Sequence, residues 1–172
     1  MTVDQLRSLI RDVPDFPKEG ILFRDVTPLL LDPAGLNAAI EAVAEPFKQA
    51  KVDRVLGIEA RGFIFGAPIA QALGAGFGLV RKAGKLPWES HSASYELEYG
   101  IDRVEMHVDT VEAGHRVLIV DDLIATGGTA AAAVELVRKA GGEMVGCSFL
   151  IELLALGGRE KLDTEFHSVL TY

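Results

Sequence analysis

The stretch VLIVDDLIATGGT, residues 117–129, combines an apolar run, two acids and a glycine-containing loop. Its first four residues predict a buried strand, and the small residues at its end predict a tight turn into a helix. Gly127 and Gly128 allow backbone amides to approach an anion closely, and the unpaired amides of a helix N-terminus favour negative charge. With the hydroxyls of Thr126 and Thr129, the loop predicts a phosphate site that needs no lysine.

Asp121 and Asp122 stand between the apolar run and the loop. Two carboxylates repel a bare phosphate, but they accept hydrogen bonds from hydroxyl groups such as those of a sugar. We therefore interpret the stretch as a site for a phosphorylated ribose, in which the loop holds the 5-phosphate and the acids hold the 2,3-diol. The loop lacks the Gly-Lys-Ser/Thr of a Walker A motif and the spacing of Gly-x-Gly-x-x-Gly. The alternative is a sharp strand-to-helix turn with accidental acids.

Strand and helix patterns alternate along the rest of the chain. This alternation predicts an α/β fold, a mostly parallel central sheet with helices on both faces, in which ligands bind beyond the carboxyl ends of the strands. The predicted helices cover residues 3–10, a segment that opens at residue 33, and residues 63–73 and 129–140; the predicted strands cover residues 54–58, 76–80, 103–108, 116–120 and 144–153.

Length and charge restrict the possible classes of protein. The 172 residues predict a single domain, and the net charge of −8 argues against a general nucleic-acid binder. The one cysteine, Cys147, allows no internal disulfide and lies in an apolar run, so we expect a buried core residue. The first eleven residues include Asp4, Arg7 and Arg11 and no apolar segment, which favours a cytoplasmic protein without a secretory signal.

Residues 62–80 are nearly long enough and apolar enough to suggest a membrane span. They contain Pro68 and five glycines, however, and nothing that flanks them resembles a second span. We expect a buried helix followed by a buried strand, and no contact with a membrane.

A second strand-to-helix turn, at residues 58–63, reads Ile-Glu-Ala-Arg-Gly-Phe. Taken alone, an ordinary helix start with a surface arginine explains it equally well. Beside the phosphate loop it becomes a candidate anion site. Three cations follow within five residues, and they form either a solvated basic turn or a cluster that neutralises an anionic leaving group: Arg81, Lys82 and Lys85.

Residues 81–100 carry charges, serines, Gly84 and Pro87 with little periodicity. We therefore predict a mobile loop without regular structure, which is typical of functional segments of this length. Trp88 either anchors this loop in a closed state or packs on a partner, and the sequence does not decide between these roles.

The stretch at residues 117–129 resembles the phosphoribosyl diphosphate signature of the type I phosphoribosyltransferases. Further motifs cover nearly the whole chain and together resemble the adenine phosphoribosyltransferase family. In order along the chain they are Phe16-Pro17, Gly20-Ile21-Leu22-Phe23-Arg24-Asp25, Glu59-Ala60-Arg61-Gly62-Phe63, Arg81-Lys82-x-Gly84-Lys85-Leu86-Pro87, Tyr95-x-Leu97-Glu98-Tyr99-Gly100 and, after the phosphate loop, Gly158-Arg159-Glu160-Lys161-Leu162. The intervening residues 88–94 depart from the family pattern.

The resemblance implies a purine-salvage reaction in which adenine and phosphoribosyl diphosphate give AMP and diphosphate. It implies Mg²⁺ held mainly by substrate oxygens, a homodimer, and a strained or cis peptide in the turn at residues 59–62. It divides the chain into an N-terminal base-binding hood, residues 1–33, and a lid, residues 81–100, on one phosphoribosyltransferase domain. No metal site built from side chains alone is expected, because the four histidines show no ligand spacing.

Site roles are assigned partly from the residues and partly from the resemblance. Phe23 offers a stacking face for the base, although an ordinary core aromatic is equally consistent with its local sequence. Glu98 resembles the family's general acid/base, although its local sequence fits a solvated side chain equally well. The full set comprises catalytic Glu98, Asp121 and Asp122; adenine-binding Leu22, Phe23 and Arg24; lid residues Tyr95 and Tyr99; and phosphoribosyl diphosphate-binding Glu59, Ala60, Arg61, Gly62, Arg81, Lys82, Lys85, Asp121, Asp122, Ala125, Thr126, Gly127, Gly128 and Thr129.

Two other functions compete with this interpretation. The same enzyme class acting on hypoxanthine, guanine or xanthine keeps the ribose site and changes the base, against the motifs around Phe23 and Glu98. A nucleotide-sensing regulator of the same fold keeps the ligand and loses the reaction. Such regulators usually carry an added nucleic-acid-binding module, for which we find no room before Phe16 and no basic charge.

Overall fold

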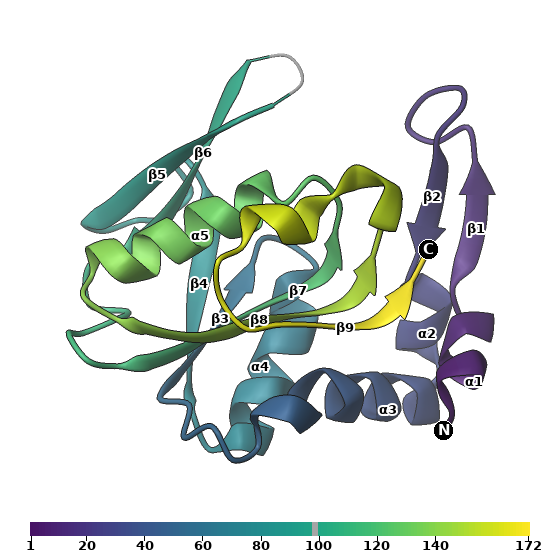
Figure 1. Ribbon diagram of the computed structural model, residues 1–172, viewed down its shortest axis with the longest axis horizontal. Helices are drawn as coiled ribbons and strands as arrows, with labels where there is room; N and C mark the ends of the chain where they lie inside the picture. Colours follow the sequence, from purple (N-terminus) through teal and green to yellow (C-terminus); the bar gives the residue numbers. More distant parts are fainter. Residues whose placement is uncertain (98–99) are drawn as a thin grey trace.

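A computed structural model describes residues 1–97 and 100–172 of the chain (Figure 1). The described residues form a central sheet of seven strands and a separate two-stranded hairpin. The sheet order is β5 (Ser90–Glu96), β6 (Ile101–His107), β4 (Gly76–Lys82), β3 (Arg54–Ile58), β7 (Arg116–Ile124), β8 (Glu143–Glu152) and β9 (Phe166–Thr171). The five strands from β4 to β9 in this order are parallel, while β6 and β5 are antiparallel additions at one edge.

Helices cover both faces of the sheet, as predicted. Strand β7 shows why: alternate side chains of a strand point to opposite faces. Val117 and Ile119 pack in the core beneath α5 (Gly128–Lys139), whereas Leu118 and Val120 pack against α3 (Pro33–Ala44) and α4 (Gly62–Leu73). In Figure 1, α5 lies on one side of the sheet and α3 and α4 on the other.

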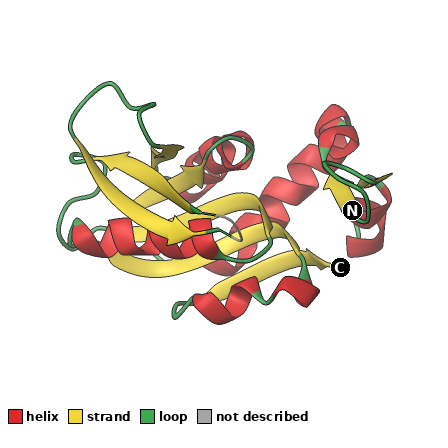
Figure 2. Ribbon diagram, turned by 90° about the horizontal axis from the view of Figure 1, so that it is seen from above, coloured by secondary structure: helices red, strands yellow, loops and turns green. Residues whose placement is uncertain are grey.

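The N-terminal hood lies at one end of the sheet, as Figures 1 and 2 both show. It contains α1 (Val3–Ser8), the antiparallel strands β1 (Arg11–Pro14) and β2 (Leu22–Asp25), and α2 (Thr27–Leu31). Thr2 caps α1 in a reciprocal capping box with Gln5, which fixes the start of this short helix. Arg7 donates a hydrogen bond to the Thr171 carbonyl at 2.8 Å, so the hood is attached to the last strand of the sheet.

Most predicted elements are confirmed with shifts of one to a few residues at their ends. Residues 62–80 divide into α4 and β4, as expected. No helix in the part of the chain that the structure describes has the length and apolarity needed to cross a membrane. Cys147 is buried, as predicted, and burial raises the pKa of its thiol to about 12. The short 3₁₀ segments are Glu45–Phe47, Leu154–Leu156 and Gly158–Lys161.

The prediction of an irregular segment over residues 81–100 is wrong in part. Strand β4 continues to Lys82, and Ser90–Glu96 forms β5, which pairs with β6 along its whole length. The polar residues of β5 hide the strand pattern because this strand lies at the edge of the sheet, and Ala93 is its one fully buried residue among those described. The predicted mobility of this segment stays a prediction.

The prediction that β7 ends at Val120 is also wrong. The strand runs to Ile124 and therefore includes both acids. Strands β1, β2 and β9 and helix α2 were not predicted, because each is too short or too polar to carry a clear period.

Candidate active site

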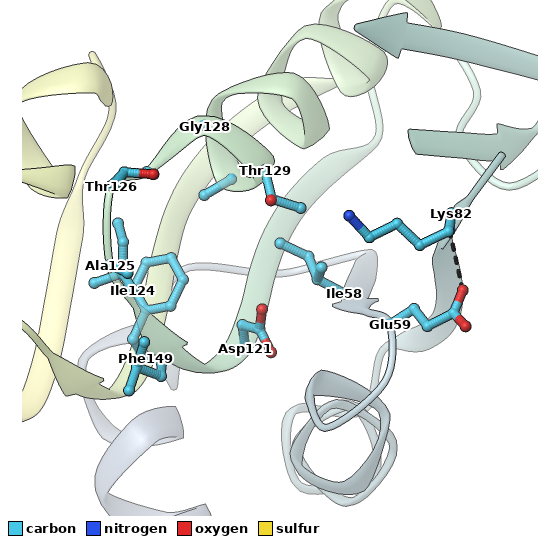
Figure 3. A pocket seen from close by; sticks show the side chains of 13 residues that line it. Ile58, Glu59, Lys82, Asp121, Ile124, Ala125, Thr126, Gly128, Thr129 and Phe149 are labelled. Atoms are coloured by element: carbon cyan, nitrogen blue, oxygen red, sulfur yellow. Dashed lines mark hydrogen bonds between the residues drawn. The ribbon is translucent and has the colours of Figure 1, made fainter. Parts of the chain in front are cut away.

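A cavity of about 230 Å³ opens where β7 turns into α5 (Figure 3). It lies at the carboxyl ends of the parallel strands, where the fold class predicts ligands to bind. Eight predicted site residues are among those that line it. The lining residues within the described part of the chain are Ile58, Glu59, Lys82, Asp121, Leu123, Ile124, Ala125, Thr126, Gly127, Gly128, Thr129, Ala130 and Phe149.

The predicted phosphate loop forms one wall of this cavity. Gly127 adopts a left-handed conformation at the N-cap of α5, and none of the described side chains caps the first turn of this helix. The first backbone amides of α5 are thus available to an anion. A Cβ on Gly127 would lie 2.3 Å from the Gly158 carbonyl oxygen, so this position requires glycine for space as well as for backbone angle.

The two acids have different surroundings. Asp121 lines the cavity, and its carboxylate accepts a 2.8 Å hydrogen bond from the Asp122 amide. Burial raises the pKa of Asp121 well above its ordinary range, and the nearby charge of Asp122 raises it further. Positive charge that develops in the cavity would stabilise the ionised form of Asp121.

Asp122 is buried and forms an ion pair with the Nε of Arg61. Successive side chains of a strand point to opposite faces, which explains why neighbouring acids reach different partners. The structure therefore places one predicted catalytic acid in the cavity and the other behind it, in contact with the second turn.

Glu59 lies at the opposite wall of the cavity, at the start of the turn between β3 and α4. Its carboxylate accepts hydrogen bonds from the Lys82 amide at 3.0 Å, from Arg81 Nε at 3.3 Å and from Lys85 Nζ. Burial alone raises the pKa of Glu59, but these hydrogen bonds outweigh it and lower the pKa below the ordinary value. Glu59 thus pairs with two of the three cations that the sequence singled out, Arg81 and Lys85, and with the backbone of the third, Lys82.

The remaining residues of this turn hold it against β7. Gly62 is buried, and a Cβ there would lie 2.9 Å from both Asp121 Oδ1 and the Val120 carbonyl oxygen. Ala60 is exposed, and the peptide bond between Glu59 and Ala60 is cis, as the resemblance suggested. The two strand-to-helix turns are therefore in direct contact at the strand ends.

The predicted base-binding residues lie on β2 in the hood. Leu22 is exposed, and Phe23 is half-buried with its ring 5.2 Å from that of Phe16. The Arg61 guanidinium lies 5.7 Å from the centre of the Phe23 ring. Arg61 therefore connects the hood to Asp122 and brings β2 next to the strand ends.

Arg24 is also on β2, but its side chain is engaged elsewhere. It pairs with Asp12 and lies 4.0 Å from the centre of the Tyr172 ring. This leaves its backbone as the part of Arg24 that could contact a base. The predicted residues Glu98 and Tyr99 lie outside the described residues.

Sequence reasoning missed Asp102 and the supporting glycine Gly158. Asp102 pairs with Lys82 and Tyr95 across three strands, and Gly158 supports the phosphate loop. The register of β5 and β6 would have been needed to find Asp102. The motif at residues 158–162 was noticed, but its contact with the loop depends on the folded chain.

Known proteins match the chain over nearly its full length. The phosphoribosyl transferase domain family matches residues 27–169. The adenine phosphoribosyltransferase of Thermosynechococcus vestitus is 59% identical over 168 residues, covering 97% of this chain and 99% of that protein. The crystal structure of the Rhodothermus marinus enzyme of the same name gives a TM-score of 0.95 at 54% identity, covering 99% of this chain and 98% of that one. The Saccharomyces cerevisiae enzyme, solved with adenine and an imino-altritol bisphosphate, gives 0.92 at 44% identity, with 97% of both chains covered.

An anion loop at a helix N-terminus, facing a carboxylate at the end of a parallel strand, is the arrangement of an α/β protein that binds an anionic ligand at its strand ends. The chain belongs to the phosphoribosyl transferase family, and within it to the adenine phosphoribosyltransferases. The predicted fold class and the predicted family are both confirmed.

Proposed function

We propose that the chain transfers the 5-phosphoribosyl group of phosphoribosyl diphosphate to adenine, giving AMP and diphosphate. The observation that carries this proposal is the cavity in which the loop Ala125–Thr129 faces Asp121. Family members of the same name support adenine as the acceptor, and the yeast enzyme was solved with adenine bound.

The loop is proposed to bind the 5-phosphate through the first amides of α5 and the hydroxyls of Thr126 and Thr129. A phosphate fixed at this point orients the anomeric carbon for displacement. Asp121 then accepts hydrogen bonds from the ribose hydroxyls and stabilises positive charge as the sugar approaches an oxocarbenium-like transition state. Asp122 contributes through Arg61, which it holds in place.

Diphosphate leaves toward the wall formed by Glu59 and its cations. Arg81 and Lys85 are gathered there by the Glu59 carboxylate, and Lys82 lines the cavity itself. Their positive charge offsets the negative charge of the leaving diphosphate. Ala60 and Gly62 contribute to this wall as parts of the turn.

Mg²⁺ is proposed to bind mainly through substrate oxygens. The described residues contain no group of three or more His, Cys, Asp or Glu side chains placed to hold a metal ion. Within the described cavity wall, Glu59 is already paired with cations, whereas Asp121 is in no ion pair. This arrangement fits an ion held by the substrate near Asp121, and when bound it supplies charge that offsets the diphosphate.

Adenine is proposed to lie beside Phe23, with backbone groups of Leu22 and Arg24 at its edge. Phe23 is only partly covered by protein and lies next to Arg61, at the junction of hood and sheet. Glu98 is proposed as the general acid/base for the purine nitrogen, and Tyr95 and Tyr99 as part of the lid.

A homodimer and a cytoplasmic location complete the proposal. Large apolar side chains are exposed on α4, on β4 and in the segment after the cation turn, namely Ile64, Leu79 and Trp88. These side chains are candidates for contact with another chain, because large apolar patches on a surface mark interaction sites. Sedimentation should give twice the mass of one chain, and a monomer at working concentration would contradict this part.

The proposed reaction is tested by measuring diphosphate release from phosphoribosyl diphosphate and Mg²⁺ with adenine, hypoxanthine, guanine or no base. Release with adenine alone, together with AMP as the product, is expected. Release with a different base would retain the ribose site and overturn the assignment of the Phe23 region. Saturable binding of phosphoribosyl diphosphate without release would favour the sensor function.

A further inference from the structure

Three neighbouring strands bring Lys82, Asp102 and Tyr95 together. Tyr95 on β5 is directly opposite Asp102 on β6, and Lys82 on β4 is opposite Val104, two residues further along β6. Residues two apart on a strand share a face, so the three side chains project from the same face of the sheet. That face is the one covered by α5, because Val104 packs in the core beneath this helix.

The three side chains form a closed set of hydrogen bonds. The Lys82 ammonium donates to the Tyr95 hydroxyl and to Asp102 Oδ2, and the Tyr95 hydroxyl donates to the same carboxylate oxygen at 2.8 Å. The hydrogen bond from Lys82 is the largest influence that lowers the pKa of Asp102 to about 2. Lys82 is therefore tied to an ionised carboxylate over the working pH range.

Lys82 also belongs to the wall of the ribose-phosphate cavity. It is the one cation among the described residues that line this cavity, and Figure 3 shows it extending from β4 toward Thr129. An ammonium group has three N–H donors. Two of them are used by Tyr95 and Asp102, and the third has no partner within the described part of the chain.

Tyr95 touches the phosphate loop as well. A Cβ on Gly128, the first residue of α5, would lie 3.0 Å from Tyr95 Cδ2, so the ring packs against the start of this helix. The ring thereby fixes the tyrosine relative to the loop, and the hydroxyl fixes the lysine relative to the tyrosine.

An untethered Lys82 would have competing partners inside the cavity. Glu59 already accepts a hydrogen bond from the Lys82 amide at 3.0 Å, and Asp121 lies in the same cavity. An ammonium that paired with either acid would no longer offer its N–H groups to an incoming anion. The contacts from β5 and β6 hold it away from these acids.

We propose that Tyr95 and Asp102 are positioning residues that hold the Lys82 ammonium at the cavity wall, with its third N–H directed to a phosphoryl oxygen of phosphoribosyl diphosphate. The proposal rests on the proposed function of the cavity and adds two residues from the antiparallel edge of the sheet to the site. Tyr95 thus has a defined task in ligand binding, and Asp102 acts only through Lys82.

The test measures binding of phosphoribosyl diphosphate with Mg²⁺ by titration calorimetry, and in parallel the KM of each substrate. Tyr95→Phe keeps the ring against Gly128 and removes one anchor, so the dissociation constant for phosphoribosyl diphosphate should rise about three- to tenfold. Asp102→Asn should also raise this dissociation constant, and Lys82→Met should raise it by at least about tenfold. Ser94→Ala removes an exposed hydroxyl next to Tyr95 on the same strand and should change nothing.

The double variant Lys82→Met with Tyr95→Phe separates positioning from general support of the fold. If Tyr95 acts through Lys82, the second substitution should add no further loss, and the KM for adenine should stay unchanged throughout. An equal loss from Tyr95→Phe in the Lys82→Met background, or no loss in the native background, would overturn the proposal. Failure of the native chain to bind phosphoribosyl diphosphate would overturn the proposed function as well, whereas binding without turnover would affect the proposed function alone.

Two fragments of phosphoribosyl diphosphate identify the group that Lys82 contacts. Inorganic diphosphate and ribose 5-phosphate are titrated separately into the native chain and the Tyr95→Phe variant. Weaker binding of diphosphate places the third N–H at the leaving group, and weaker binding of ribose 5-phosphate places it at the 5-phosphate. Unchanged binding of both fragments would contradict the proposal.

Discussion

The two strand-to-helix turns of the site lie side by side at the carboxyl ends of β3 and β7, yet they present charge in opposite ways. The turn after β7 offers backbone amides and hydroxyls and carries no cation. The turn after β3 is organised by ion pairs, with Glu59 bound to Arg81 and Lys85, and Arg61 bound to Asp122. One anion site is built from the helix itself, and the other is assembled from side chains of several strands.

This difference fits the separate roles proposed for the two turns. Backbone amides cannot be displaced, which fits the proposed role of the β7 turn in holding the 5-phosphate, a group that stays bound through the reaction. Ion-paired cations can exchange Glu59 for a substrate anion, which suits a leaving group whose charge must be received and then released. The predictions below test this division, beginning with the largest expected effect.

The β7 turn should carry most of the chemistry. Replacing Asp121 and Asp122 together by Asn should lower turnover by about 10²–10³-fold, because charge stabilisation at the ribose is lost. Asp121→Asn alone should account for most of this loss, since Asp122 pairs with Arg61 outside the cavity. Steady-state kinetics with adenine measure the effect, and Asp163→Asn, which removes an exposed acid from a pair with Arg138, is the control. Near-normal turnover of the double variant would refute the assignment.

The loop of this turn should tolerate no side chain at Gly127. Gly127→Ala forces a left-handed residue, at a cost of roughly 1–2 kcal/mol, and adds a clash with Gly158 that overpacking data place at about 1–3 kcal/mol more. Gly74→Ala is the matched control, because Gly74 is also left-handed but has open space around it. Urea unfolding of both variants isolates the cost of the clash, and equal losses would show that Gly158 does not restrain the loop.

The contrast between the turns also explains what the sequence could predict. The β7 turn is local: its strand, acids, glycines and helix start follow one another within residues 117–129. Its structure could therefore be predicted except for the end of the strand, and its ligand stays a prediction. The parallel strands and their helices were found for a similar reason, because buried strands are continuous apolar runs and amphipathic helices have a clear period. The polar edge strand β5 has no such pattern, and its pairing with β6 was missed.

The β3 turn depends on residues distant in the sequence. Glu59 was predicted to bind substrate, but its carboxylate binds Arg81 and Lys85, which lie more than twenty residues away. The pairing of Asp122 outside the cavity likewise depends on where Arg61 lies. The contact of Asp102 with Tyr95 depends on the register between β5 and β6. Such partners become visible only when strand order and register are known.

Replacement of Arg61 should affect the binding of adenine more than the binding of phosphoribosyl diphosphate. Because it joins Asp122 to the hood beside Phe23, Arg61→Met should raise the KM for adenine by about three- to tenfold, and that for phosphoribosyl diphosphate by less. Arg138→Met removes an exposed arginine from a pair with Asp163 and should leave both values unchanged. A larger effect on phosphoribosyl diphosphate than on adenine would place Arg61 with the leaving-group cations instead.

The smallest effect should come from the pH dependence of Glu59. Its pKa in the folded protein is lowered by hydrogen bonds from Lys85, the Lys82 amide and Arg81, which outweigh the opposite effect of burial. A lowered pKa means that the ionised group stabilises the fold fully above its ordinary pKa near 4.5, and that this contribution disappears as the pH falls through the lowered value. The difference in unfolding free energy between the native chain and Glu59→Gln should therefore be constant near neutral pH and shrink below about pH 4.5.

Urea titrations of the native chain and Glu59→Gln between neutral and acidic pH measure this difference. The control is Glu112→Gln, which removes an exposed acid that pairs with His115 in the turn before β7. If the difference grew on acidification, the carboxyl would be protonated in the native state and the cations would not be held by it. If the difference in unfolding free energy shrinks only for Glu59→Gln, Arg81 and Lys85 are held by an ionised Glu59. In the proposed reaction, the diphosphate takes the place of that charged acid as the partner of Arg81 and Lys85.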